Sequence, residues 1–428
     1  MGYALLLAFV VLLTLGIPLA FAMGVSTVLY FLTHPNFTLL TIPQKMVTGL
    51  DSFPLLAIVF FLLTGSLMNH SGSTQRLVNL AAVLVGHITG GLGQINIVAN
   101  MIVSGMTGSA TADTVATGSV LIPTMIRSGL PRGFAAAVTA AGATIGPMVP
   151  PSIAFVIVGS IANVSIGRLF LGGVVPALIM ALYFMVVVYL IAKRRRYGTT
   201  TARASFGQIW RAFWAAAPAL LTVVIILGGI LGGVFTPTEA GAVAAVYALV
   251  LGVASRGLPL AVFPRILIEV VVMNAAVMFV LGVFNVATWI LTIEQVPQTL
   301  TSAFTSFTQS PAIFLLITNL VLLVLGTIIE PLPLEIVVAP MYLPLLAIYH
   351  INPVHFFVVF VLNIMVGLIH PPIGMNMFIA CQIARANIME FISEVWPFLV
   401  ALLIVLFLVT YVPALVVFLP NWLMGPGQ

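Results

Sequence analysis

The chain has 428 residues, of which 62% are hydrophobic and only 5% are charged, and its formal net charge is +5. In soluble domains roughly a quarter of all residues are charged. This composition therefore excludes a water-soluble protein and predicts one embedded in the lipid bilayer. Membrane-spanning chains are helical or form closed barrels, and long apolar runs without alternation exclude the barrel. We therefore expect an all-α integral membrane protein.

Several classes of chemistry are absent from the sequence. The single cysteine, Cys381, excludes internal disulfides and a cysteine-built metal site. The histidines show no metal-ligand spacing, and no P-loop, GxSxG or HExxH motif occurs. We expect neither an enzyme nor an organic cofactor. The N-terminal stretch MGYALLLAFV lacks the basic region of a cleaved signal peptide, so we expect it to be retained as part of the first span.

Apolar segments define the predicted helices in chain order. A spanning helix needs roughly 17–25 residues, and the segments that satisfy this length are 3–32, 54–70, 133–164, 169–192, 212–235, 238–255, 266–291, 353–384 and 397–419. Two further segments, about 90–127 and 310–348, are apolar but interrupted at their centres by polar residues or prolines. Each is predicted to form two half-length helices that enter and leave on one side, as a re-entrant hairpin.

The one clear hydrophilic segment is KRRRYGTTTARASFGQIWR at 193–211, which holds six of the 14 basic residues. A solvated cytoplasmic linker explains it, so no nucleic-acid partner is expected. With both hairpins re-entrant, 12 of the 14 basic residues fall on the cytoplasmic side. These are Arg76, Arg127, Arg132, Lys193, Arg194, Arg195, Arg196, Arg203, Arg211, Arg256, Arg265 and Arg385, whereas Lys45 and Arg168 lie on the other side.

The sequence also contains an internal repeat. IGPMVPPS at 145–152 resembles VGLIHPPI at 366–373, at an offset of 221 residues. At the same offset, VLIPTM (120–125) aligns with MYLPLL (341–346). Basic loops in one copy match uncharged loops in the other, which predicts inverted repeats. The predicted units are a first repeat at 1–192, the linker at 193–211 and a second repeat at 212–428. Each contains one hairpin and one broken helix, at 133–164 and 353–384.

The broken segments are the candidate functional sites. A broken helix leaves free carbonyls at one end and free N–H groups at the other, and these suit a cation and an anion respectively. The first cluster contains a carboxylate, hydroxyls and carbonyls, which are hard oxygen ligands for a small cation. Its members are Ser104, Thr107, Ser109, Thr111 and Asp113 with Gly146, Val149 and Pro150. Asp113 is either a functional intramembrane acid or a structural acid that caps a half-helix, and the two roles are compatible.

The second cluster lies at the matching position of the other copy. Its members are Gly326, Thr327 and Glu330 with Gly367, His370 and Ile373. Glu330 is suited to cap a half-helix that begins with proline. His370 is either a packed, hydrogen-bonded side chain or a residue near the ligand. Asn376, which we expect near the substrate with Thr111, Pro151 and Glu330, also suits an interhelical hydrogen bond.

Together these motifs resemble one transporter family over the whole chain. They are SGMTGSATADTVATGSVLIPTM (104–125), GPMVPPS (146–152), the IIEPL and AP..LP pattern (328–344) and GLIHPPIG (367–374). The chain is similar to the large membrane subunit, DctM-like, of TRAP transporters, the tripartite ATP-independent periplasmic systems. The long first motif is specific, whereas the Pro-Pro motifs alone are not.

The resemblance implies an elevator-type protein of the bacterial inner membrane, with a scaffold and a mobile transport domain. It implies sodium-driven uptake of a small organic anion, a carboxylate or a sulfonate, with two partners: a small four-helix membrane subunit (DctQ-like) and a periplasmic binding protein (DctP-like). It places one sodium ion (Na⁺) among Ser104, Thr107, Ser109, Asp113, Gly146, Val149 and Pro150, and a second around Gly326, Gly367, His370 and Ile373. His370 departs from the family, where a threonine often precedes Pro-Pro, so a hydroxyl ligand is lost there.

Three other functions are compatible with an apolar helical chain. A self-sufficient ion-coupled anion symporter of related fold would transport without a binding protein. A membrane enzyme acting on lipids would need a catalytic dyad, and no convincing pair occurs in the sequence. A channel would show conductance without alternating access.

Overall fold

The computed structural model describes residues 2–34, 36–197, 202–255 and 257–426, which form helices and no strand. The all-α prediction is confirmed. Eight helical stretches within these ranges are long and apolar enough to cross a membrane. Met1, the linker residues 198–201, Arg256 and the last two residues of the predicted second repeat lie outside the described residues.

The first half of the chain runs from α1 to α10. Its elements are α1 Gly2–Thr14, α2 Leu19–Thr33, α3 Thr41–Leu50, the 3-10 turn η1 Phe53–Leu55, α4 Leu56–His70, α5 Ser73–Val85, α6 Gly91–Thr107, α7 Ala110–Arg127, α8 Arg132–Ala143, the 3-10 turn η2 Gly146–Met148, α9 Ile153–Ala162 and α10 Ile166–Arg195.

The second half runs from α11 to α20. Its elements are α11 Phe206–Leu231, α12 Pro237–Ala254, the 3-10 turn η3 Leu260–Val262, α13 Phe263–Ile293, α14 Val296–Phe307, α15 Pro311–Gly326, α16 Pro331–Ile348, α17 Pro353–Gly367, α18 Met375–Ala384, α19 Ile388–Tyr411 and α20 Ala414–Met424.

The helices α14 to α19 follow the same order as α5 to α10. The matched helices begin at nearly the offset of the sequence repeat: α7 at Ala110 and α16 at Pro331, α8 at Arg132 and α17 at Pro353. Both predicted hairpins are helix pairs, α6 with α7 and α15 with α16, and both broken segments are interrupted at their prolines. The peptide bonds Pro150–Pro151 and Pro371–Pro372 are both cis.

Several predicted boundaries were wrong. The segment 3–32 is two helices, because Gly16 at φ +80° and Pro18 interrupt it. The segment 397–419 begins earlier, as α19, and breaks at Pro413 before α20. The linker is shorter than 193–211, since α10 continues to Arg195 and α11 begins at Phe206.

Three further helices, α3, α5 and α14, lie outside the long apolar segments from which the helices were predicted. They are only 10 to 13 residues long and carry polar residues between their apolar ones. Their apolar residues recur at helical spacing, so a search for amphipathic periodicity would have found them.

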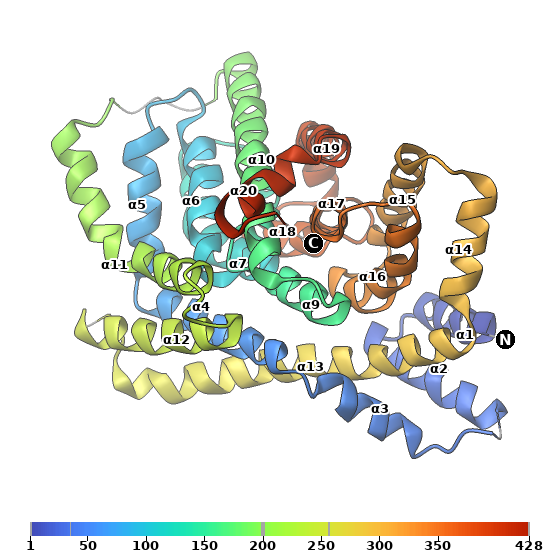
Figure 1. Ribbon diagram of the computed structural model, residues 1–428. Helices are drawn as coiled ribbons and strands as arrows, with labels where there is room; N and C mark the ends of the chain where they lie inside the picture. Colours follow the sequence, from blue (N-terminus) through green and yellow to red (C-terminus); the bar gives the residue numbers. More distant parts are fainter. Residues whose placement is uncertain (1, 35, 198–201, 256, 427–428) are drawn as a thin grey trace.

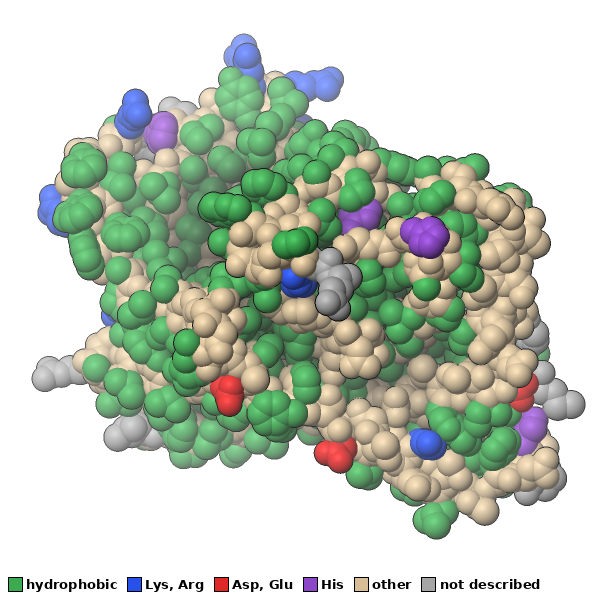
Figure 2. All heavy atoms as spheres, in the orientation of Figure 1, with side chains coloured by type: hydrophobic (Ala, Val, Ile, Leu, Met, Phe, Trp, Pro, Cys, Tyr) green, Lys and Arg blue, Asp and Glu red, His purple; other side chains and the backbone are tan. Residues whose placement is uncertain are grey.

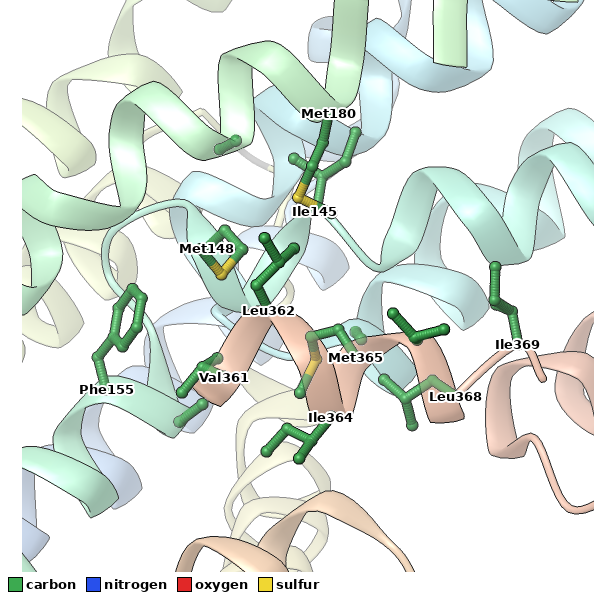
Figure 3. Close-up of a cluster of buried hydrophobic side chains, with 14 of the residues drawn as sticks. Ile145, Met148, Phe155, Met180, Val361, Leu362, Ile364, Met365, Leu368 and Ile369 are labelled. Carbon is green, nitrogen blue, oxygen red and sulfur yellow. The ribbon is translucent and has the colours of Figure 1, made fainter. Parts of the chain in front are cut away.

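The broken helices form the interior of the molecule. Every residue of α8 from Gly133 to Ala143 is buried, and so is every residue of α17 from Val354 to Gly367. The alanines of α8 allow α6, α7, α18 and α19 to pack closely around it. In Figure 3, Leu362 of α17 lies beside Met148 of the first break, and Val361 of α17 lies near Phe155 of α9. The two broken segments therefore share one core.

A second group of helices surrounds this core. The helices α4, α12 and α13 run across the lower part of Figure 1, below α5, α6 and α10, and α4 packs against both α12 and α13. Figure 2 shows hydrophobic side chains over much of the visible face, whereas most of the visible Lys and Arg side chains gather at its upper left, around the end of α10. This distribution suits a protein whose sides face lipid.

The backbones of α15 and α17 are in close contact at Gly326 and Gly367. A Cβ atom on Gly367 would overlap the Gly326 carbonyl oxygen and lie 3.1 Å from the Gly326 Cα. We expect Gly367→Ala to push α15 away from α17 and to lower the free energy of unfolding by about 1–3 kcal/mol. Thermal unfolding in detergent measures this change.

Gly228→Ala is the matched control, because a Cβ atom at this position of α11 meets no atom within 4 Å. It should leave the midpoint unchanged or raise it slightly. Equal effects of the two substitutions would contradict the close backbone contact.

Candidate functional site

The tip of the first hairpin is seated on the first helix break. Gly108 joins α6 to α7 with φ +62°, and a Cβ atom there would overlap the Pro151 carbonyl oxygen. The Ile153 N–H donates to the Gly108 carbonyl at 3.3 Å. Ser109 caps α7 by accepting from the Ala112 N–H at 3.5 Å. Glycine is needed at the tip because both its backbone angle and its contact exclude a side chain.

Asp113 lies in the first turn of α7 and is fully buried. The Ser104 hydroxyl donates to one carboxylate oxygen at 2.5 Å, and the Thr107 hydroxyl donates to the other. A Cβ atom on Gly146 would overlap the same carboxylate and lie 3.1 Å from the Ser104 Oγ. Residues from α6, α7 and the first break are therefore gathered around one acid, and none of these contacts is to a basic side chain.

A network of amide and hydroxyl groups joins α6, α7 and α8 next to this acid. Asn100, one turn before Ser104, accepts from the Thr117 hydroxyl at 2.8 Å and donates to the Asn96 side chain at 2.8 Å. Asn96 donates in turn to the Thr139 hydroxyl of α8 at 2.8 Å. Because these side chains are all buried, their bonds hold α6, α7 and α8 in a single register.

The second break is arranged differently. Gly326 and Gly367 are in direct backbone contact. The His370 ring contacts the Pro371 carbonyl through Nδ1 and lies edge-on to Trp396 of α19, with 6.4 Å between ring centroids. Its side chain is therefore engaged locally. Thr327 donates to the Val324 carbonyl at 2.7 Å, and Ile373 is 52% exposed.

A cavity of about 440 Å³ lies between the two hairpin tips. Its wall includes the first residues of four helices: Ala110 of α7, Ile153 of α9, Pro331 of α16 and Met375 of α18. The side chains of Ser109 and Thr111 also line it. Helix N-termini carry partial positive charge and free N–H groups, so their convergence favours a bound anion.

The part of the cavity wall that α4 and α13 contribute is apolar. Leu62 of α4 and Met273, Ala276 and Val277 of α13 form it. These side chains offer no hydrogen bond to a polar ligand. The polar contacts available in the cavity therefore come from the hairpins and the broken helices.

The structure brings together some of the predicted residues and separates others. Contacts with the Asp113 carboxylate are made by Ser104, Thr107 and Gly146. The Pro150 carbonyl lies near Gly105, the residue after Ser104, at 3.7 Å from a Cβ atom built there. Val149 donates its N–H to the Gly146 carbonyl at 3.0 Å, within the break. Thr111 and Glu330 line the cavity, and Pro151 lies behind Gly108.

Asn376 points away from the cavity. Its side-chain amide donates to the Ala140 carbonyl of α8 at 3.5 Å, as expected for an interhelical bond. Glu335 was missed: it lines the cavity from α16 and is only 2% exposed. The signal was present in EPLPLE, since a carboxylate inside an apolar segment is a functional candidate by default.

The two hydroxyl donors to Asp113 can be tested by an isosteric change. Thr107→Val removes one donor and leaves a buried carboxylate oxygen without its partner. It should lower the free energy of unfolding by about 1–3 kcal/mol. Thr114→Val is the control: this buried hydroxyl, on the residue after Asp113, donates to the Ala110 carbonyl of the preceding turn at 2.8 Å. Equal shifts in thermal unfolding would contradict the special role of Thr107.

Comparison with solved structures finds a similar fold. The crystal structure of the YdaH transporter of Alcanivorax borkumensis, described as having an unusual topology, superimposes with a TM-score of 0.66 over 89% of each chain. At 15% sequence identity, this likeness concerns the fold alone.

Comparison of sequences identifies the family. The chain is 43% identical to the sialic acid TRAP transporter large permease protein SiaM of Vibrio cholerae, over 97% of this chain and 98% of the relative. It is 34% identical to the C4-dicarboxylate TRAP transporter large permease protein DctM of Rhodobacter capsulatus, over 97% of each chain. It is 36% identical to the isethionate permease DctMQ of Oleidesulfovibrio alaskensis, over 96% of this chain and 65% of the relative. Residues 6–415 match the model of the tripartite ATP-independent periplasmic transporter, DctM component, and the chain belongs to this family of inner-membrane large permeases.

Proposed function

We propose that this chain is the sodium-coupled permease of a three-part uptake system for a small carboxylate or sulfonate. A small membrane subunit and a periplasmic binding protein, the partners with which the family functions, would complete the system. The observation that carries the proposal is the convergence of four helix N-termini on one cavity. Such a cavity can hold the negative group of an organic acid without any basic side chain.

The Asp113 cluster fits a sodium ion by its chemistry. A small hard cation is bound by carboxylate, hydroxyl and backbone carbonyl oxygens. Asp113, Ser104 and Thr107 supply such oxygens together, and the backbone at Gly146 lies against the carboxylate. A bound sodium ion would supply the positive charge that neutralises Asp113 and couples uptake to the ion gradient. Each charge that crosses the membrane contributes about 2.3 kcal/mol per 100 mV.

An elevator movement is supported by the asymmetry of the cavity. Its polar groups belong to the hairpins and the broken helices, whereas α4 and α13 contribute only apolar side chains. An acid bound by the hairpins and broken helices makes no hydrogen bond to α4 or α13. None therefore has to break when these two groups of helices slide past each other. The hairpins and broken helices would thus form the mobile body, and α4, α12 and α13 part of the scaffold. The matched helix order and the uneven distribution of basic loops support inverted repeats.

At the second break, an ion would depend on backbone oxygens. Gly326 and Gly367 have no side chains, and the His370 ring is engaged with Pro371 and Trp396. We therefore propose that His370 contributes its carbonyl and not its imidazole to any second sodium site.

Asp113→Asn tests sodium coupling without knowledge of the substrate. An ion that binds only the folded state raises the unfolding midpoint with its concentration. The purified wild-type chain should be stabilised by sodium chloride relative to choline chloride at equal ionic strength. Asp113→Asn should lose most of this response, because the sodium ion loses its charged partner.

Asp51→Asn is the control, because Asp51 is an exposed acid at the end of α3. It should keep the full sodium response. A sodium response of Asp113→Asn equal to that of the wild type would overturn the proposed ion site.

A further inference from the structure

The cavity between the hairpin tips contains two acids and no base. Its lining residues include Glu330 and Glu335, and among the described lining residues there is no Lys, Arg or His. This is an unexpected charge for a site that holds an organic acid. The helix N-termini account for binding of the acid group, but they leave the two glutamates unexplained.

The two glutamates differ in their surroundings. Glu330 is exposed at the start of α16, where water can solvate its carboxylate. Glu335 lies in the second turn of the same helix and is 2% exposed. Within the described parts of the chain it has no hydrogen-bond or ion-pair partner. The fold does not pair this carboxylate, although a buried charge is costly unless it is paired.

We propose that Glu335 binds a cationic nitrogen of the substrate, so that the permease takes up small acids that also carry an ammonium group. The acid group lies at the N-termini of α7, α9 and α18, and the ammonium group lies at Glu335. The substrate class is thus an aminocarboxylate or an aminosulfonate. This inference rests on the proposed function and specifies its substrate.

The selectivity follows from desolvation. An amino acid pairs with the Glu335 carboxylate when it enters the cavity, whereas a hydroxy acid of the same size leaves that carboxylate without an opposite charge. A site that contains a buried charged group discriminates strongly against a ligand that cannot pair with it. Glu335 therefore determines the difference in affinity between an amino acid and the hydroxy acid of the same size, and not the affinity for the acid group that both share.

Matched pairs of acids test the proposal. The probes are taurine with isethionate, aspartate with malate, and β-alanine with 3-hydroxypropionate, each added to the purified full chain in lipid nanodiscs with sodium chloride. Binding is measured by isothermal titration. We expect the amino member of at least one pair to bind at least about tenfold more tightly than its hydroxy partner. Glu335→Gln should remove this preference, and Glu335→Asp should retain part of it.

Glu390→Gln is the control for the loss of one negative charge, since Glu390 is exposed on α19. It should keep the wild-type preference. If Glu335→Gln is poorly folded, Glu335→Asp decides: with normal thermal unfolding it should show a reduced preference, and a preference equal to that of the wild type would overturn the inference.

Three results would overturn the inference: equal or tighter binding of every hydroxy acid, an unchanged preference in Glu335→Gln, or no binding of any amino acid at millimolar concentration. Sodium-dependent binding of the hydroxy acids alone would overturn only the inference and leave the proposed function standing. An absence of sodium-dependent binding for all six probes, together with a normal sodium response of Asp113→Asn, would overturn both.

Discussion

Four helices of this protein begin at the wall of one internal cavity, and the rest of the structure depends on that constraint. A helix start leaves N–H groups without partners, which is costly away from water. The chain meets this cost in two ways. Ser109 and Ser152 cap α7 and α9 with their side chains, whereas α16 and α18 have no side-chain cap. Each serine accepts only one N–H, so further N–H groups of α7 and α9, together with those of the uncapped α18, remain for the acid group of a bound anion.

The two halves stabilise their hairpins by different means. In the first half, the buried amides and hydroxyls of α6, α7 and α8 form a hydrogen-bonded network around Asn100. In the second half, Asn363 of α17 donates to Asn319 of α15 at 2.9 Å, and aromatic rings supply much of the remaining packing. Phe314 of α15 stacks on Tyr349 at 4.5 Å between centroids, and Tyr342 of α16 lies 5.2 Å from Phe356 of α17. Each such aromatic pair contributes about 0.5–1.5 kcal/mol beyond its buried area.

Much of this arrangement could be predicted from the sequence, because prolines and glycines interrupt helices by local chemistry. The breaks at GPMVPPS and GLIHPPIG, the two hairpins and the position of Asp113 beside the first break follow from such local rules. The cavity could not be predicted, since its apolar wall comes from Leu62 and the middle of α13, which no local pattern distinguishes from lipid-facing residues. Glu335 was overlooked because it does not occupy the position that corresponds to Asp113 at the repeat offset, which is Leu334. The amphipathic helices α5 and α14 are not predicted by long apolar runs, because polar residues interrupt their apolar ones.

The central claim is that the first hairpin and the first break together bind a coupling ion at Asp113. The most direct measurement is a high-resolution cryo-electron microscopy map of the protein in nanodiscs, recorded once in sodium chloride and once in choline chloride. The account predicts density among the Asp113 carboxylate, the Ser104 and Thr107 hydroxyls and the backbone at Gly146 in sodium, and no such density in choline. Identical maps in the two salts, with the carboxylate bonded only to its two hydroxyl donors, would contradict it.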